Sequence, residues 1–239
     1  ELTVSMDRSS QEFVHSVSGE PAVAPDYSTR FVYPLTPSVG VIAQRGVESL
    51  EAYAPYVLAF NEEIGSIEIV QDSKRRIYRR QPTTLLGDSI QLIPVEIHSA
   101  SGECLASYKV AFVTNGAVTV AILAKGDGDS HEIEFGAAVP KLFMAFPLFG
   151  TEGIGFPGVL NSRQFFPKKN RDGLYLGQEE SEYNITNKAL VEKACPLFLT
   201  LLQQCASFNW KGIERLCHVT KSEPIRGIDE AWLQSLVKA

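Results

Sequence analysis

Apolar and polar positions alternate along much of the chain before Phe149, which predicts a series of short β-strands. Two segments instead carry apolar residues at helical spacing, residues 46–58 and residues 187–207. Together these patterns predict an α+β fold, in which both helices cover one face of a mixed sheet. The predicted strands are residues 2–6, 30–35, 64–70, 74–80, 90–98, 105–114, 117–124, 131–135 and 141–148.

Individual residues predict where these elements turn, bend and begin. Asn115-Gly116 lies between two strands and predicts a β-hairpin with a type I′ turn. Pro55 removes a backbone donor from the first helix, so a kink or break is expected just before it. Asn184 or Thr186 is expected to cap the second helix, and Asp229 a last short helix.

The segment from Phe146 to Gly177 differs in composition from the rest of the chain. Its frequent glycines and prolines are typical of a segment that positions a loop, because glycine frees the backbone and proline fixes φ. The chain has a formal net charge of -6, yet this loop gathers basic side chains. Such a cluster indicates either an anionic ligand or a solvated basic turn. Its cations are Arg163, Lys168, Lys169 and Arg171.

Residues 74–80 form the most basic run of the sequence, Lys-Arg-Arg-Ile-Tyr-Arg-Arg. Basic residues with an interleaved aromatic ring can bind nucleic acid through phosphate contacts and base stacking. Lysine and arginine are also typical of an exposed edge strand, where they prevent aggregation. The run is therefore a candidate docking strand or an ordinary solvated strand.

Composition bounds the class of protein. With 239 residues, 44% of them apolar, the chain can bury a substantial core. It has no apolar run long enough to cross a bilayer. Its first residue is Glu1 rather than Met, so we expect the chain to be a piece of a longer protein. Four cysteines without a C-x-x-C pair predict buried free thiols and favour the cytoplasm. The acidic charge argues against a general nucleic-acid binder.

No catalytic or metal-binding constellation is recognisable in the sequence. The histidines at positions 15, 98, 131 and 218 are scattered, without a pair at helical spacing or an acidic neighbour at ligand spacing. No local signature accompanies a serine or cysteine nucleophile. We therefore expect neither a metal site nor an enzyme that is complete within this chain.

Several groups of residues carry a resemblance to a known family. Residues 147–152, the Phe156-Pro157 pair, residues 160–162 and residues 170–176 resemble the middle segment of sacsin-type ATPases. Residues 50–69 are similar to the segment that follows the ATP-binding core in the bacterial members. These proteins belong to the gyrase, heat-shock chaperone, histidine kinase and mismatch-repair (GHKL) superfamily.

The resemblance implies a transducer-like domain with a left-handed βαβ crossover, placed after an ATP-binding core. Residues 1–28 would be the end of that core or a linker, residues 29–180 the transducer-like domain, and residues 181–239 a C-terminal helical segment packed on it. The chain lacks the family's nucleotide-binding motifs. ATP and magnesium would therefore be held by a preceding domain of the same protein, the implied partner, and a homodimer is a further option.

The resemblance also assigns roles to residues of the central loop. Arg171 takes the place of the basic side chain that reaches the terminal phosphate of ATP. Lys168 and Lys169 could make this contact instead, and Asn161 matches the asparagine of the family pattern. Asp172 would hold Arg171 in an ion pair until nucleotide competes. The parent protein would then be an ATPase, although this chain alone is not catalytic.

A different class of function stays open beside this one. The chain could be a non-catalytic interaction module that docks protein or nucleic acid through the basic strand 74–80.

Overall fold

The computed structural model describes residues 37–71, 74–87, 89–126, 131–136, 139–216 and 227–238. The chain divides into two compact units, residues 1–43 and residues 44–239, and the account below concerns the second. The strands predicted at residues 2–6 and 30–35 lie outside the described residues.

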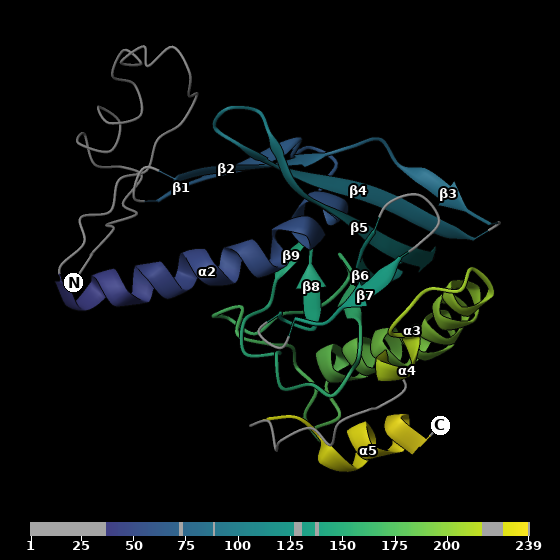
Figure 1. Ribbon diagram of the computed structural model, residues 1–239. Helices are drawn as coiled ribbons and strands as arrows, with labels where there is room; N and C mark the ends of the chain where they lie inside the picture. The colour runs from purple at the N-terminus through teal and green to yellow at the C-terminus, as the bar shows by residue number, and fades with distance from the viewer. Residues whose placement is uncertain are drawn as a thin grey trace. The chain divides into compact units, whose positions relative to one another are not determined.

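A curled mixed sheet is the framework of the described residues (Figure 1). Its strand order is β1-β2-β4-β5-β6-β10-β8-β9, with β3 paired to β4 and β7 paired to β6. Neighbouring strands are antiparallel except β8 and β10, which are parallel. The strands are β1 (Ser66–Gln71), β2 (Lys74–Arg80), β3 (Thr84–Leu86), β4 (Ile90–Ser99), β5 (Cys104–Asn115), β6 (Val118–Lys125), β7 (Glu132–Glu134), β8 (Leu142–Met144), β9 (Phe146–Pro147) and β10 (Val159–Asn161).

The two long helices lie on opposite faces of this sheet. The C-terminal half of α2 (Pro37–Phe60) packs with Ile93 and Val95 of β4, whereas α3 (Glu182–Ser207) packs with Leu92 of the same strand. The α+β prediction is confirmed, but the structure differs from the expectation that both helices cover one face. The reason is visible in β6, where Val120 to Ala124 are all buried, so both faces of the strand need a cover.

The parallel pair of strands is reached without a helix. Residues 145–158 connect β8 to β10 and contain only β9 and turns. The strand predicted at residues 141–148 is divided because Ala145 takes a φ of 60° and reverses the chain between β8 and β9. The strand-helix-strand crossover that the resemblance implies is therefore not formed by this pair.

The sequence predicts a kink or a break near Pro55, and the break is not present, because helix α2 continues through Pro55 to Phe60. Proline removes one hydrogen-bond donor from the helix, but burial of the flanking turn favours the continuous helix. The residues on both sides of Pro55 are buried in the core on the α2 face of the sheet. They are Tyr53, Ala54 and residues 56–60.

The hairpin between β5 and β6 is confirmed, and its turn lies one residue later than predicted. Asn115 pairs with Val118, so the two turn residues are Gly116 and Ala117. Gly116 has a φ of 60°, and Ala117 is not among the described residues with positive φ. A glycine at the first turn position followed by negative φ is typical of a type II′ turn, not type I′.

Helix α3 begins earlier than its apolar stripe indicates. Ser181 is the N-cap, and its hydroxyl accepts a hydrogen bond from the backbone N–H of Asn184 at 3.2 Å. The predicted caps Asn184 and Thr186 are therefore wrong, because both lie inside the helix. The predicted cap of α5 (Glu230–Lys238) is confirmed, since Asp229 accepts a hydrogen bond from the N–H of Trp232. A short helix, α4 (Ile213–Leu216), follows α3.

Candidate functional site

Residues 167–174 of the basic loop fold into a tight hairpin, and three of the four cations of the loop, Lys168, Lys169 and Arg171, lie in it. Pro167 and Leu174 form a bridge at its base, and the N–H of Lys168 donates to the carbonyl of Gly173 at 2.9 Å. The N–H of Arg171 donates back to the carbonyl of Lys168 at 2.8 Å. Arg171 has a φ of 55°, a left-handed conformation that such a short turn requires. The backbone of the tip is therefore fixed by its own hydrogen bonds.

Helix α3 holds the base of this hairpin through one fully buried side chain, Asn187. Its Oδ1 accepts a hydrogen bond from the N–H of Phe166 at 2.8 Å. Its Nδ2 donates to the carbonyls of Phe166 and Tyr175, at 2.9 and 3.0 Å. One turn earlier, Asn184 bonds in the same way to the N–H of Gly177 and the carbonyl of Glu179. The hairpin is thus fastened directly to a long helix.

The structure brings three of the predicted site residues together on this tip. Lys169 and Arg171 are exposed, and Lys168 is half-buried. The ammonium of Lys168 lies beside Gly227, where an added Cβ would come within 3.1 Å of it. In the described part of the chain neither Arg171 nor Asp172 forms an ion pair, so the expected pairing of these neighbours is not present.

Asn161, the fourth predicted site residue, lies elsewhere and has a structural contact. Its Oδ1 accepts a hydrogen bond from the N–H of Ala145 at 2.9 Å. The carbonyl of Ala145 accepts one from Asn61 at 2.8 Å. The two asparagines therefore hold the left-handed residue between β8 and β9 from both sides.

The basic strand β2 is partly neutralised by acidic neighbours. Arg75 bonds to Glu68 of β1 at 2.7 Å, and Arg76 forms an ion pair with Glu51 of α2. Tyr78 is only 3% exposed, and burial, together with the charge of Glu51, raises its pKa to about 12. A ring buried in this way is not available for base stacking. The edge of the described sheet is also β1 rather than β2.

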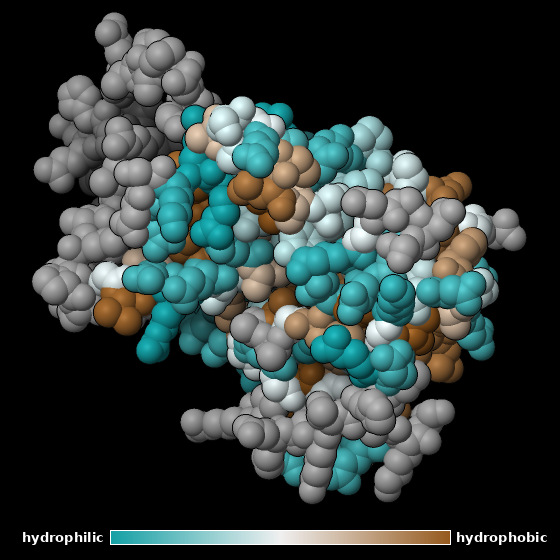
Figure 2. Space-filling view, in the orientation of Figure 1, coloured by the Kyte–Doolittle hydropathy of each residue, from teal (hydrophilic) through white to brown (hydrophobic). Residues whose placement is uncertain are grey.

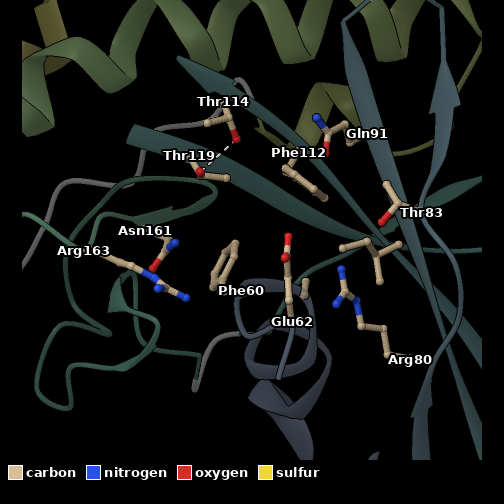
Figure 3. A pocket seen from close by; sticks show the side chains of 12 residues that line it. Phe60, Glu62, Arg80, Thr83, Gln91, Phe112, Thr114, Thr119, Asn161 and Arg163 are labelled. Atoms are coloured by element: carbon tan, nitrogen blue, oxygen red, sulfur yellow. Dashed lines mark hydrogen bonds between the residues drawn. The ribbon is translucent and has the colours of Figure 1, made fainter. Parts of the chain in front are cut away.

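A hollow of about 470 Å³ opens on the α2 face of the sheet, beyond the end of that helix. Figure 3 shows Asn161 and Arg163 on one side of it and Arg80 and Thr83 on the other, with Phe112 on the sheet between them. It is lined by Ala59, Phe60, Glu62, Arg80, Thr83, Gln91, Ile93, Phe112, Thr114, Thr119, Asn161 and Arg163.

Comparisons of the sequence and the structure with other proteins give no match. No family model matches the chain, and no curated protein and no solved structure matches it significantly. Within the described ranges no helix is long and apolar enough to cross a membrane. On the face shown in Figure 2, apolar side chains form separate groups among hydrophilic ones.

The described side chains include three free thiols. No group of three or more His, Cys, Asp or Glu side chains that could hold a metal occurs among the described residues. Cys104, Cys195 and Cys205 are free thiols, as predicted, but Cys104 is exposed. Burial raises the pKa of the Cys205 thiol to about 12, so it stays protonated and unreactive near neutral pH. Cys217 lies outside the described residues.

The cations of the tip could be found from the sequence because they lie within four positions of one another, whereas the residues that position them were missed. Asn184 and Asn187 stand three positions apart at the start of the apolar stripe of α3. Two asparagines on a buried helix face are a usable signal, since a buried amide needs hydrogen-bond partners outside the helix.

Proposed function

We propose that this chain is the middle, transducer-like part of a GHKL-type ATPase. In this proposal the tip of hairpin 167–174 senses the terminal phosphate of ATP held by a preceding domain, together with magnesium. Binding of the phosphate by the tip couples ATP binding and hydrolysis to a rearrangement of domains. The chain itself supplies a sensing residue, Arg171, and no nucleotide site of its own. The parent protein is a cytoplasmic ATPase in this account.

The observation that carries the proposal is the construction of the tip. Lys169 and Arg171 are exposed on a backbone that is fixed by two hydrogen bonds, and no acidic side chain of the described residues pairs with them. A cation that is already positioned loses little conformational freedom on binding a phosphate. Since the hairpin is bonded to Asn187, displacement of the tip acts directly on α3.

The experiment is to measure ATP turnover by the full-length protein that contains this chain. Arg171→Ala is expected to lower kcat by about 10³-fold or more, because an arginine that stabilises a transferring phosphoryl group contributes about 10³–10⁵. Arg171→Lys keeps the charge and should retain part of the activity. Lys193→Ala is the matched control, since it removes an exposed cation from α3 and should leave turnover unchanged.

Lys168 and Lys169 are tested in the same assay. If Arg171→Ala alone has normal turnover but Lys168→Ala or Lys169→Ala does not, the sensing role moves to that lysine. Normal turnover by the variant that lacks all three cations, with unchanged folding, contradicts the proposal.

A second candidate is a docking module that uses the edge of the sheet. It is favoured by strand β1, which ends the described sheet and exposes 66% of Val70. The neighbouring strand β2 carries the exposed Lys74 and Arg79. An open edge strand can pair with an extended segment of a partner. Val70→Pro would block such pairing and leave the hairpin tip intact, so it separates the two candidates.

A further inference from the structure

The hollow on the α2 face of the sheet and the hairpin tip are formed by different residues. None of residues 167–174 lines it, whereas Asn161 and Arg163, which precede the hairpin, do. Arg80 comes from the end of the basic strand β2. The fold therefore joins two basic segments that are far apart in the sequence.

The side chains around this hollow present mainly hydrogen-bond donors. Neither Arg80 nor Arg163 forms an ion pair with any residue that the structure describes. The Oδ1 of Asn161 is occupied by the N–H of Ala145, which leaves its Nδ2 as a donor at the hollow. Guanidinium and amide donors of this kind bind phosphate and carboxylate oxygens.

The floor of the hollow is apolar in part, since Gln91, Thr114 and Thr119 also line it from the sheet. Figure 3 shows Phe112 of β5 on the sheet side and Phe60, the last residue of α2, beside it. The buried Ile93 of β4 also lines the hollow. A ligand that fits both parts has an anionic group between the two arginines and a flat or apolar body against the phenylalanines. Glu62 is the one acid in the lining, and it opposes an anion there.

We propose that this hollow binds a small oxyanion ligand with an aromatic or apolar body. Arg80 and Arg163 hold the oxyanion from opposite sides, Asn161 donates a further hydrogen bond, and Phe112 contacts the body. The chemistry is shared by phosphate monoesters and carboxylates. The site is independent of the proposed phosphate-sensing role, because it uses neither the hairpin tip nor a preceding domain.

Binding is measured on the isolated chain by amide chemical shifts in NMR, with phenyl phosphate, benzoate and inorganic phosphate as separate probes. Phenyl phosphate is expected to shift the amides of Phe112, Thr114, Thr119 and Asn161 in a saturable way. A stronger effect of benzoate would identify a carboxylate ligand instead. Inorganic phosphate should bind more weakly than phenyl phosphate, because it does not contact the aromatic floor.

Three variants test which side chains bind the probe. Arg80→Gln and Arg163→Gln should each weaken binding by about tenfold or more, since each removes charge-assisted hydrogen bonds. Glu62→Gln removes the opposing charge and should tighten binding, a gain that loss of folding could not produce. Lys193→Gln is the matched control, because it removes an exposed cation of α3 that does not line the hollow, and it should bind as the wild type does.

The proposal is overturned if the probes shift no residue of the hollow, or if Arg80→Gln and Arg163→Gln bind as tightly as the wild type. Shifts confined to residues 168–172 would also overturn it, because they would place the anion on the tip alone. A failure here leaves the ATP turnover experiment with Arg171 unaffected.

Discussion

At the scale of single residues, Asn187 decides whether the basic hairpin has a fixed position. It satisfies three backbone groups of Phe166 and Tyr175 at a fully buried point. Asn187→Ala leaves these groups without their partner, and a buried unsatisfied group costs about 1–3 kcal/mol. We expect the free energy of unfolding, measured with urea, to fall by about 2–4 kcal/mol.

Asn170→Ala is the matched control for this prediction. Asn170 is exposed at the tip of the same hairpin, so its replacement should change stability by less than about 0.5 kcal/mol. Equal stabilities of the Asn187 and Asn170 variants would show that α3 does not hold the hairpin.

A second residue prediction concerns pH. The hydrogen bond from Lys188 at 2.7 Å, followed by that from the N–H of Trp232, lowers the pKa of Asp229 below its ordinary value of 3.8. A carboxyl group whose pKa is lower in the folded than in the unfolded state stabilises the fold at pH values above the unfolded-state pKa. This stabilisation is lost as the pH falls through the folded-state pKa.

Asp229→Asn should therefore be less stable than the wild type at pH 7. The difference should shrink as the pH falls below the ordinary carboxyl value of 3.8. Urea unfolding followed by tryptophan fluorescence at several pH values measures this. Glu103→Gln, an exposed carboxyl that forms no ion pair within the described ranges, is the control. A difference that is constant down to pH 2 would contradict the assignment.

At the scale of elements, the contact of β10 with β6 depends on Gly158. A Cβ at this position would lie 2.9 Å from the carbonyl oxygen of Ala121 in β6 and 3.4 Å from the ring of Phe198 in α3. Backbone atoms of a central strand cannot move away easily. Gly158→Ala should lower the free energy of unfolding by about 1–3 kcal/mol, the usual cost of overpacking.

Gly65→Ala is the control for this substitution, because a Cβ added at Gly65 would meet nothing within 4 Å. Its stability, measured by the same urea titration, should differ little from that of the wild type. If Gly158→Ala is equally harmless, β10 is not held as closely against β6 as the structure has it.

Most of the strands could be predicted from the sequence, since each alternates or is continuously apolar over its own length. The faces that the helices cover could not, because they depend on the order in which strands pair. The caps of α3 were mistaken for a similar reason. Asn184 is a cap-forming residue type, but inside the helix its side chain bonds to the N–H of Gly177 and the carbonyl of Glu179.

The candidate sites divide in the same way. Lys168, Lys169 and Arg171 are neighbours in sequence, so their cluster is visible before folding. Arg80 and Arg163 both line the hollow, although they are far apart in the sequence. Only the strand order β2-β4-β5-β6-β10 of the folded sheet brings them to one place.

At the scale of the whole molecule, the two proposed anion sites lie at separate places among the described residues of an acidic chain. One is the hairpin tip, which faces outward from a base bonded to α3. The other is the hollow on the opposite, α2 face of the sheet. In the two proposals, the tip contacts a phosphate held by another domain, whereas the hollow binds a small ligand by itself.

The most direct test of the central claim is photo-crosslinking of the full-length protein with an ATP analogue that carries the reactive group on its γ-phosphate. Crosslinked peptides are mapped by mass spectrometry, and excess ATP serves as the competitor. The account predicts a crosslink within residues 167–174 that ATP abolishes and that Arg171→Ala weakens. Crosslinks confined to the nucleotide-binding domain, with none in this hairpin, would contradict it.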